Sequence, residues 1–67
     1  MPELKTELRS YRQNANMKQE ELGLLVGVRR ETIARLEKGL YNPSLKLAMG
    51  IAAVFGVAVE DLFKFED

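Results

Sequence analysis

Two short stretches in the middle of the chain carry apolar residues on one side of a helix, at the spacing i, i+3, i+4. They are Leu22, Leu25 and Val26 in the first stretch, and Ile33 and Leu36 in the second. Gly27 and Gly39 follow these stretches, and glycine is common just past a helix end because it adopts positive φ at little steric cost. The pattern predicts two short helices joined by a tight turn around Gly27.

Three further helices are expected around this central pair. The first covers residues 3–14, the second runs from Ser44 or Leu45 to Phe55 with Ser44 as its cap, and the last covers residues 59–64. The inward positions are Leu4, Leu8 and Tyr11 in the first of these helices, and Val59, Leu62 and Phe63 in the last.

The helix that ends at Phe55 is apolar nearly all round. We expect one set of its residues to face the core, namely Leu45, Ala48, Ala52 and Phe55. A second set points elsewhere, namely Leu47, Ile51 and Val54. One small domain is not expected to cover both sets, so the candidate dimer patch consists of Leu47, Val54, Phe63 and Phe65. The alternative is a chain end that folds back and packs Phe65 on its own core.

The composition limits the chemistry that the chain can perform. Its 67 residues form one domain, and 46% hydrophobic residues suffice for a single core. Cysteine and histidine are both absent, which excludes disulfides and removes the usual zinc ligands and the commonest general base. No apolar run approaches the roughly 18 residues of a membrane span, and the N-terminal residues lack a signal-peptide pattern. We therefore expect a cytoplasmic protein that is not an enzyme and has no metal or cofactor.

Charge is unevenly distributed along the chain, although the formal net charge is zero. Residues 9–38 contain seven Lys or Arg against four Glu, whereas residues 57–67 contain one Lys against four acidic residues. A basic stretch is typical of a nucleic-acid-binding surface, but ordinary solvated helix faces give the same count. Charge alone leaves both interpretations open.

The main candidate site is the start of the second helix of the central pair. Such a pair is the sequence form of a helix-turn-helix, whose second helix enters the major groove of DNA with its N-terminal end foremost. Here that end reads Arg29, Arg30, Glu31 and Thr32, with Arg35 one turn further on. The fork of Arg30 matches the O6 and N7 acceptors of guanine. Glu31 would accept from a cytosine amino group or orient Arg30, and Thr32 would meet a phosphate or a thymine methyl group. Solvated charges with an internal Glu31–Arg35 pair are the alternative.

Two helix starts in this region lack the usual Ser or Thr cap. Lys18 stands at the first, so Asn16 would cap that helix instead, with Gln19 completing a capping box. Arg29 stands at the second, at a cost of about 1 kcal/mol. Broken local rules tend to mark functional sites, and we therefore expect Arg29 to reach a DNA phosphate.

The stretch from Leu4 to Phe63 resembles the helix-turn-helix domain of the phage repressor and Cro group, also called the xenobiotic response element (XRE) family. The residues that fit its spacing are Gln19, Leu22, Gly27, Ile33, Leu36, Glu37, Gly39, Asn42, Pro43, Ser44, Gly56 and Val57. Gly23 departs from it, since alanine is usual there, and close packing of the two helices is a plausible compensation. The resemblance implies an all-α fold of five short helices that binds double-stranded DNA.

The resemblance also implies roles for individual residues. The base-reading positions of the family are here Arg29, Arg30, Glu31 and Arg35. Gln19 would meet a DNA phosphate, and the expected phosphate contacts are then Gln19, Arg29, Thr32 and Lys38. Arg12 would pair with Glu37 and so tie the first helix to the recognition helix. Two independent surface charges are the alternative for Arg12 and Glu37.

The sequence thus predicts a transcriptional regulator, a repressor, that binds a two-fold symmetric operator as a homodimer. No second domain that would sense a small-molecule effector is visible in the sequence, and no effector is expected. A protein-interaction module of the same fold, such as an antitoxin or a coactivator, is the alternative that zero net charge and the acidic end keep open.

Overall fold

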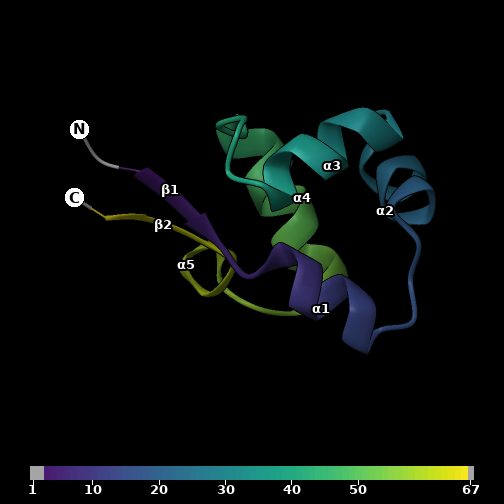
Figure 1. The fold of residues 1–67 in the computed structure, drawn as a ribbon. Helices are drawn as coiled ribbons and strands as arrows, with labels where there is room; N and C mark the ends of the chain where they lie inside the picture. Colours follow the sequence, from purple (N-terminus) through teal and green to yellow (C-terminus); the bar gives the residue numbers. More distant parts are fainter. Residues whose placement is uncertain (1–2, 67) are drawn as a thin grey trace.

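The computed structural model describes residues 3–66 and contains, over that range, five helices and two short strands (Figure 1). In chain order they are β1 (Glu3–Thr6), α1 (Leu8–Asn14), α2 (Gln19–Val26), α3 (Arg30–Glu37), α4 (Leu45–Phe55), α5 (Val59–Leu62) and β2 (Phe63–Glu66). The predicted fold of five short helices is confirmed, with the two strands as a minor addition.

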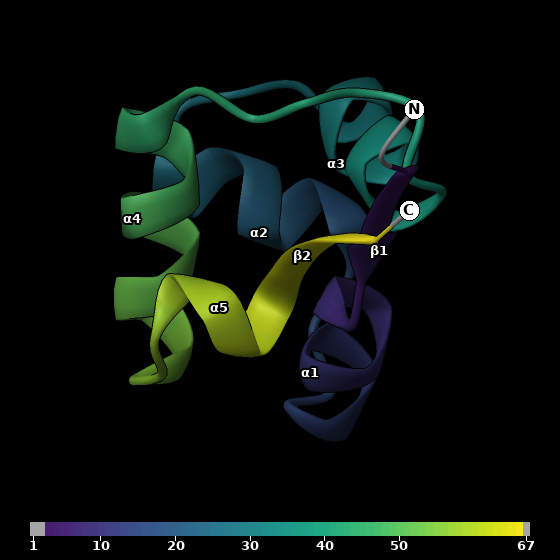
Figure 2. The ribbon, with the colours of Figure 1, turned by 90° about the vertical axis from the view of Figure 1, so that its left-hand side faces the viewer.

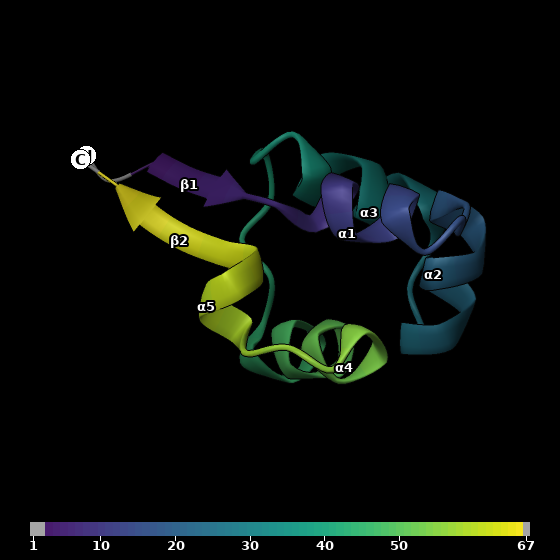
Figure 3. The same cartoon turned by 90° about the horizontal axis from the view of Figure 1, so that it is seen from below.

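The helices enclose one core, and the two strands lie together at one end of the domain (Figure 1). Figures 2 and 3 show α4 on the opposite side of the domain from α1. The buried apolar side chains between them are Leu8, Leu22, Ile33, Leu36, Leu47, Ala48, Ile51, Ala52, Leu62 and Phe63. Because each helix contributes to this set, the position of α3 depends on all of the others.

The first helix is shorter than predicted, because residues 3–6 form strand β1. β1 pairs antiparallel with β2, and Leu4 lies opposite Phe65. Half-buried and exposed residues alternate along β1, which is the period of a strand. The hydroxyl of Thr6 accepts a hydrogen bond from the backbone N–H of Leu8 at 3.1 Å, and such a local bond favours a helix start at Leu8.

The last helix is also shorter than predicted and ends at Leu62, because Phe63–Glu66 continue as strand β2. β1 supplies this segment with backbone hydrogen-bond partners from the other end of the described chain. The backbone N–H of Glu7 also donates to the carbonyl oxygen of Leu62 at 2.9 Å. A pairing between such distant segments has no signal in the local pattern at residues 59–64.

Two of the predicted apolar stripes are wrong in detail. Leu25 of α2 is exposed, although Leu22 is fully buried. The buried residues of α4 are Leu47, Ala48, Ile51 and Ala52. Leu45, which was expected to face the core, is 73% exposed. The centre of the buried face falls between the two predicted sets, because a helix that is apolar nearly all round has no polar face to orient it.

Two glycines shape the turn between α2 and α3, Gly27 through its positive φ and Gly23 through the close approach of the turn residue Val28. Gly27 ends α2 in the left-handed region, at φ 79° and ψ 30°. Gly23 lies inside α2, where a Cβ would stand 2.6 Å from the carbonyl oxygen of Val28, well inside van der Waals contact. The carbonyl of Gly23 also accepts a hydrogen bond from the N–H of Val28 at 2.9 Å. Close packing therefore accounts for the glycine at position 23.

Candidate nucleic-acid interface

The recognition helix α3 packs its apolar face against the core and exposes charged residues to solvent on its other face. Ile33 and Leu36 are fully buried in the core, which fixes the rotation of the helix about its axis. The exposed residues on this helix and directly before it include the four predicted base readers, Arg29, Arg30, Glu31 and Arg35. Thr32 is half-buried. The structure thus leaves all four predicted readers accessible from outside the domain.

The start of α3 offers a site for an anion. Arg29 occupies the N-cap position with an extended backbone, at φ −78° and ψ 158°. Its guanidinium has no acceptor atom, so it cannot satisfy the N–H groups of the first turn. The N–H of Thr32 donates to the carbonyl oxygen of Arg29 at 3.1 Å, so the N–H groups of Arg30 and Glu31 and the positive end of the helix dipole favour a negative group at this place.

Arg30 and Glu31 form the weaker of two arginine–glutamate pairs on α3. Nη2 of Arg30 lies 3.8 Å from Oε1 of Glu31, and the two side chains are 59% and 65% exposed. Exposed pairs of this kind contribute about 0–1 kcal/mol. Either side chain can therefore leave the pair for a base edge at little cost. Within residues 3–66, Glu31 pairs with Arg30 and not with Arg35, which was the alternative partner.

Arg12 and Glu37 form the stronger pair, which links α1 to the end of α3. Nε of Arg12 donates to Oε2 of Glu37 at 2.5 Å and Nη2 donates to Oε1 at 3.1 Å, so the contact is bidentate. The side chains are only 11% and 5% exposed. The hydrogen bond to Glu37 raises the pKa of Arg12 above its ordinary value, while partial burial acts in the opposite direction. The third nitrogen, Nη1, donates to the carbonyl oxygen of Met17 at 2.8 Å.

Gln19 joins this pair, a contact that the sequence did not indicate. Its Nε2 donates to Oε1 of Glu37 at 3.1 Å, so the carboxylate of Glu37 accepts from both Arg12 and Gln19. The three residues come from α1, from the first position of α2 and from the last position of α3. No local spacing could have revealed the contact, because the three helices meet only in the folded domain.

The start of α2 differs from the expected capping arrangement. Lys18, not Asn16, is at the N-cap position, and Asn16 is exposed with a positive φ of 54°. The carboxylate of Glu21 accepts a hydrogen bond from the backbone N–H of Lys18 at 3.0 Å. The box is therefore completed from Glu21, and the amide of Gln19 is left to contact Glu37.

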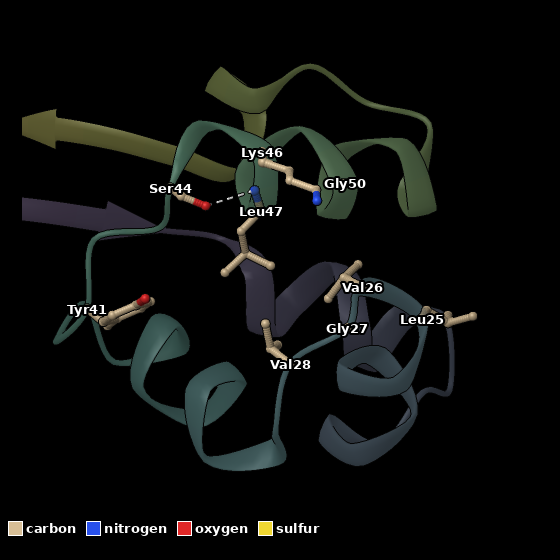
Figure 4. A pocket seen from close by; sticks show the side chains of 9 residues that line it. All are labelled: Leu25, Val26, Gly27, Val28, Tyr41, Ser44, Lys46, Leu47 and Gly50. Atoms are coloured by element: carbon tan, nitrogen blue, oxygen red, sulfur yellow. Dashed lines mark hydrogen bonds between the residues drawn. The ribbon is translucent and has the colours of Figure 1, made fainter.

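A hollow of about 500 Å³ opens between the turn of the central pair and α4 (Figure 4). Val26, Val28 and Leu47 point into this space, and Lys46 lies along α4 at its edge (Figure 4). The hydroxyl of Ser44 is occupied, since it accepts a hydrogen bond from the N–H of Leu47 at 3.1 Å, as the predicted cap requires. The hollow therefore combines apolar side chains with the polar groups of Tyr41, Ser44 and Lys46, and it lies behind the turn, away from the charged face of α3.

The predicted dimer patch needs correction. Leu47 and Phe63 were assigned to the patch, but both belong to the core, at 9% and 7% exposure, which for Phe63 agrees with its predicted inward position. Val54 is half-buried and packs against the core. Phe65 is 61% exposed and extends beyond the helices on β2. A hollow of about 420 Å³ beside Phe65 is also lined by Leu40, another exposed residue.

Over residues 3–66 there is no group of three or more His, Cys, Asp or Glu side chains that could hold a metal ion. Among the helices in the same range, none has the length and apolar character needed to cross a membrane.

The class of the protein follows from the central pair, in which two short helices meet at a glycine turn and the second exposes arginines above a buried Ile33 and Leu36. This is a helix-turn-helix domain. Residues 8–62 match the model of the helix-turn-helix family of XRE type, and the chain belongs to that family. Its members are DNA-binding transcriptional regulators, so this chain binds DNA in regulating transcription.

Several relatives span nearly the same length as this chain. An uncharacterised HTH-type transcriptional regulator of Archaeoglobus fulgidus is 58% identical over 64 residues, which cover 96% of this chain and 91% of the relative. The regulator MJ0272 of Methanocaldococcus jannaschii, also uncharacterised, is 52% identical over 64 residues, covering 96% of this chain and 97% of that one.

Solved structures of regulators share the fold. The restriction-modification controller protein C.AhdI of Aeromonas hydrophila superposes with a TM-score of 0.73 at 28% identity, over 81% of this chain and 82% of that one. The clp gene regulator ClgR of Corynebacterium glutamicum superposes with a TM-score of 0.74 at 28% identity. The matched part covers 81% of this chain and 57% of ClgR, so only part of that regulator has a counterpart here.

Proposed function

We propose that this protein is a repressor that binds a specific, two-fold symmetric DNA operator as a homodimer. The observation that carries the proposal is the contrast between the two faces of α3. Its inner residues are fully buried and its end is held by Arg12 and Glu37, while Arg30, Glu31 and Arg35 are exposed. A helix fixed in this way presents base-reading groups in a constant orientation.

In this proposal, base recognition comes from the exposed residues at the start of α3. Arg30 contacts the O6 and N7 atoms of a guanine, and such a two-pronged contact contributes about 1–3 kcal/mol of discrimination. Glu31 accepts from a cytosine amino group, and Arg35 reads a base one turn further along the groove. Arg29 is proposed both to read a base and to contact a phosphate, because it also lies close to the favourable anion site at the start of α3.

Phosphate contacts fix the register of the helix on the duplex. The proposed set is Gln19, Arg29, Thr32 and Lys38. An amide group has two donor hydrogens, so Gln19 keeps one for a phosphate while it donates the other to Glu37. Lys38 caps the end of α3 and is exposed.

Dimerisation would place two recognition helices in successive major grooves, about 34 Å apart. With Leu47 and Phe63 in the core, the proposed contact moves to Phe65 and Leu40, which line one hollow and are both exposed. Phe65→Ser should then shift the sedimentation coefficient from that of a dimer toward that of a monomer. Leu24→Ser is the matched control, because Leu24 is also exposed but lies on α2. Equal sedimentation of both variants and the parent would count against this interface.

The experiment that tests the function is selection of binding sites from a random duplex pool, at low and at near-physiological salt. Enrichment of a two-fold symmetric site that survives the higher salt would support the proposal and supply the operator. Binding that vanishes without sequence preference as salt rises would contradict base reading, because non-specific affinity depends on counterion release.

A second candidate function is a protein-interaction module of the same fold, such as an antitoxin or a coactivator. Exposed leucines favour it, since Leu24 and Leu25 lie next to each other near the end of α2, and Leu25 also lines the hollow behind the turn. If the selection enriches no site, this candidate becomes the better one. A partner protein would then protect Leu24 and Leu25 from solvent in hydrogen–deuterium exchange.

A further inference from the structure

A smaller hollow lies between α1 and the second half of α3, and basic side chains line it. Its volume is about 260 Å³, several times the roughly 30 Å³ that a water molecule occupies in the liquid. The lining residues are Arg9, Arg12, Gln19, Ala34, Glu37 and Lys38. Ala34 contributes only a methyl group, so the space above this turn of α3 stays open.

The charges around this hollow do not cancel. Arg12 and Glu37 neutralise each other in the buried pair. Arg9 and Lys38 are exposed and, within residues 3–66, neither forms an ion pair with a carboxylate. The hollow therefore keeps two free positive charges, one from α1 and one from the end of α3. Gln19 adds the amide hydrogen that Glu37 does not use.

We propose that this hollow binds a phosphate group of the DNA backbone and that Arg9 is one of its donors. The proposal rests on the DNA-binding function proposed above and extends the contact surface from the helix-turn-helix to α1. A phosphodiester presents two charged acceptor oxygens, which match a guanidinium, an ammonium and an amide placed around one space. The phosphate at Arg29 and this one would hold the recognition helix at both of its ends.

The hollow lies at the C-terminal end of α3, so a phosphate can bind there only if the two free cations attract it. The C-terminal end of a helix carries partial negative charge, which opposes the binding of an anion there. Lys18, which is exposed beside Gln19, lies outside the lining of this hollow. Arg9 and Lys38 are therefore the residues that would have to overcome the dipole.

The test compares Arg9→Gln with Lys64→Gln, which removes one positive charge from the exposed strand β2. Affinity for an enriched duplex is measured by fluorescence anisotropy over a series of salt concentrations, and circular dichroism checks that each variant is folded. Because each neutralised phosphate adds about 0.9 to the slope of log affinity against log salt, Arg9→Gln should lower that slope by about one. Arg9→Lys should keep the slope, and Lys64→Gln should leave it unchanged.

The outcomes separate this proposal from the function on which it rests. If the parent binds duplexes with sequence preference and Arg9→Gln behaves like Lys64→Gln, the phosphate site is wrong and the function stands. If the parent binds no duplex, both fail. A titration with inorganic phosphate, monitored through the NMR signals of Arg9 and Lys38, tests whether the hollow binds a free phosphate ion instead of DNA. Saturable shifts in that titration without a slope change on DNA would assign the hollow to a free anion and overturn the proposal.

Discussion

The two arginine–glutamate pairs on α3 show how burial divides similar side chains between structure and recognition. The side chains of Arg12 and Glu37 are only 11% and 5% exposed and share two hydrogen bonds. Arg30 and Glu31 are more than half exposed and approach only to 3.8 Å. The pair of Arg12 and Glu37 fixes the C-terminal end of α3, whereas Arg30 and Glu31 at its N-terminal end are proposed to contact DNA bases. The comparison indicates that an arginine near a recognition helix can be assigned to DNA only after its burial is known.

The largest expected effect comes from breaking the buried pair. Glu37→Gln leaves the charge of Arg12 buried without a full counter-charge, and removal of one partner of a buried pair costs about 3–5 kcal/mol. Glu31→Gln should change the free energy of unfolding by less than about 0.5 kcal/mol, because its pair is exposed. Urea unfolding measures both variants. Equal losses would contradict the division between the two pairs.

A double variant separates the loss of the ion pair from the burial of an unpaired charge. Arg12→Met combined with Glu37→Leu removes both buried charges and leaves apolar side chains of comparable size, which recovers stability in other buried pairs. The double variant should therefore be more stable than Glu37→Gln. If the double variant is less stable than Glu37→Gln, the ion pair stabilises the fold beyond the cost of leaving one charge unpaired.

An intermediate effect is expected from Gln19, which touches the structural pair and is also proposed to touch DNA. Gln19→Ala removes a hydrogen bond to a charged group, worth about 1.5–3 kcal/mol. It should also weaken binding to all duplexes by a similar factor, because a phosphate contact carries no sequence information. Urea unfolding and anisotropy on two unrelated duplexes measure the two effects. A change in base preference at one position would show that Gln19 reads a base instead.

The smallest effect on stability, with the clearest effect on recognition, is expected from Arg30. Arg30→Ala should leave the free energy of unfolding within about 0.5 kcal/mol of the parent. It should reduce discrimination at one base pair by about 1–3 kcal/mol, measured by repeating the site selection. Lys38→Ala is the contrasting variant, since it should weaken all sequences alike and lower the salt slope by about one. Unchanged base preference in Arg30→Ala would remove Arg30 from the proposed readers.

The central part of the molecule could be predicted from the sequence. Apolar spacing and the glycine at position 27 located α2 and α3 to within about one residue, and Ser44 marked the start of α4. These signals are local, because a helix is made by interactions between residues three and four apart. The pairing of Arg12 with Glu37 came from the family resemblance and is present in the structure.

The predictions that failed concern features that depend on contacts between distant segments of the chain. Strands β1 and β2 join the two ends of the described chain, and residues 3–6 taken alone continue a helical stripe through Leu4. The buried face of α4 is selected by the surrounding helices, which also decided that Leu47 is core and Leu45 is not.

By itself, the sequence determined the helix-turn-helix, the order of the five helices and the charged residues at the start of α3. Only the tertiary structure decided which charges are shielded from solvent, that Gln19 reaches Glu37, and that Arg9 and Lys38 line the same hollow. The reason is physical. Helix formation is encoded over one or two turns of chain, whereas burial and the meeting of α1, α2 and α3 arise only when the whole core is assembled.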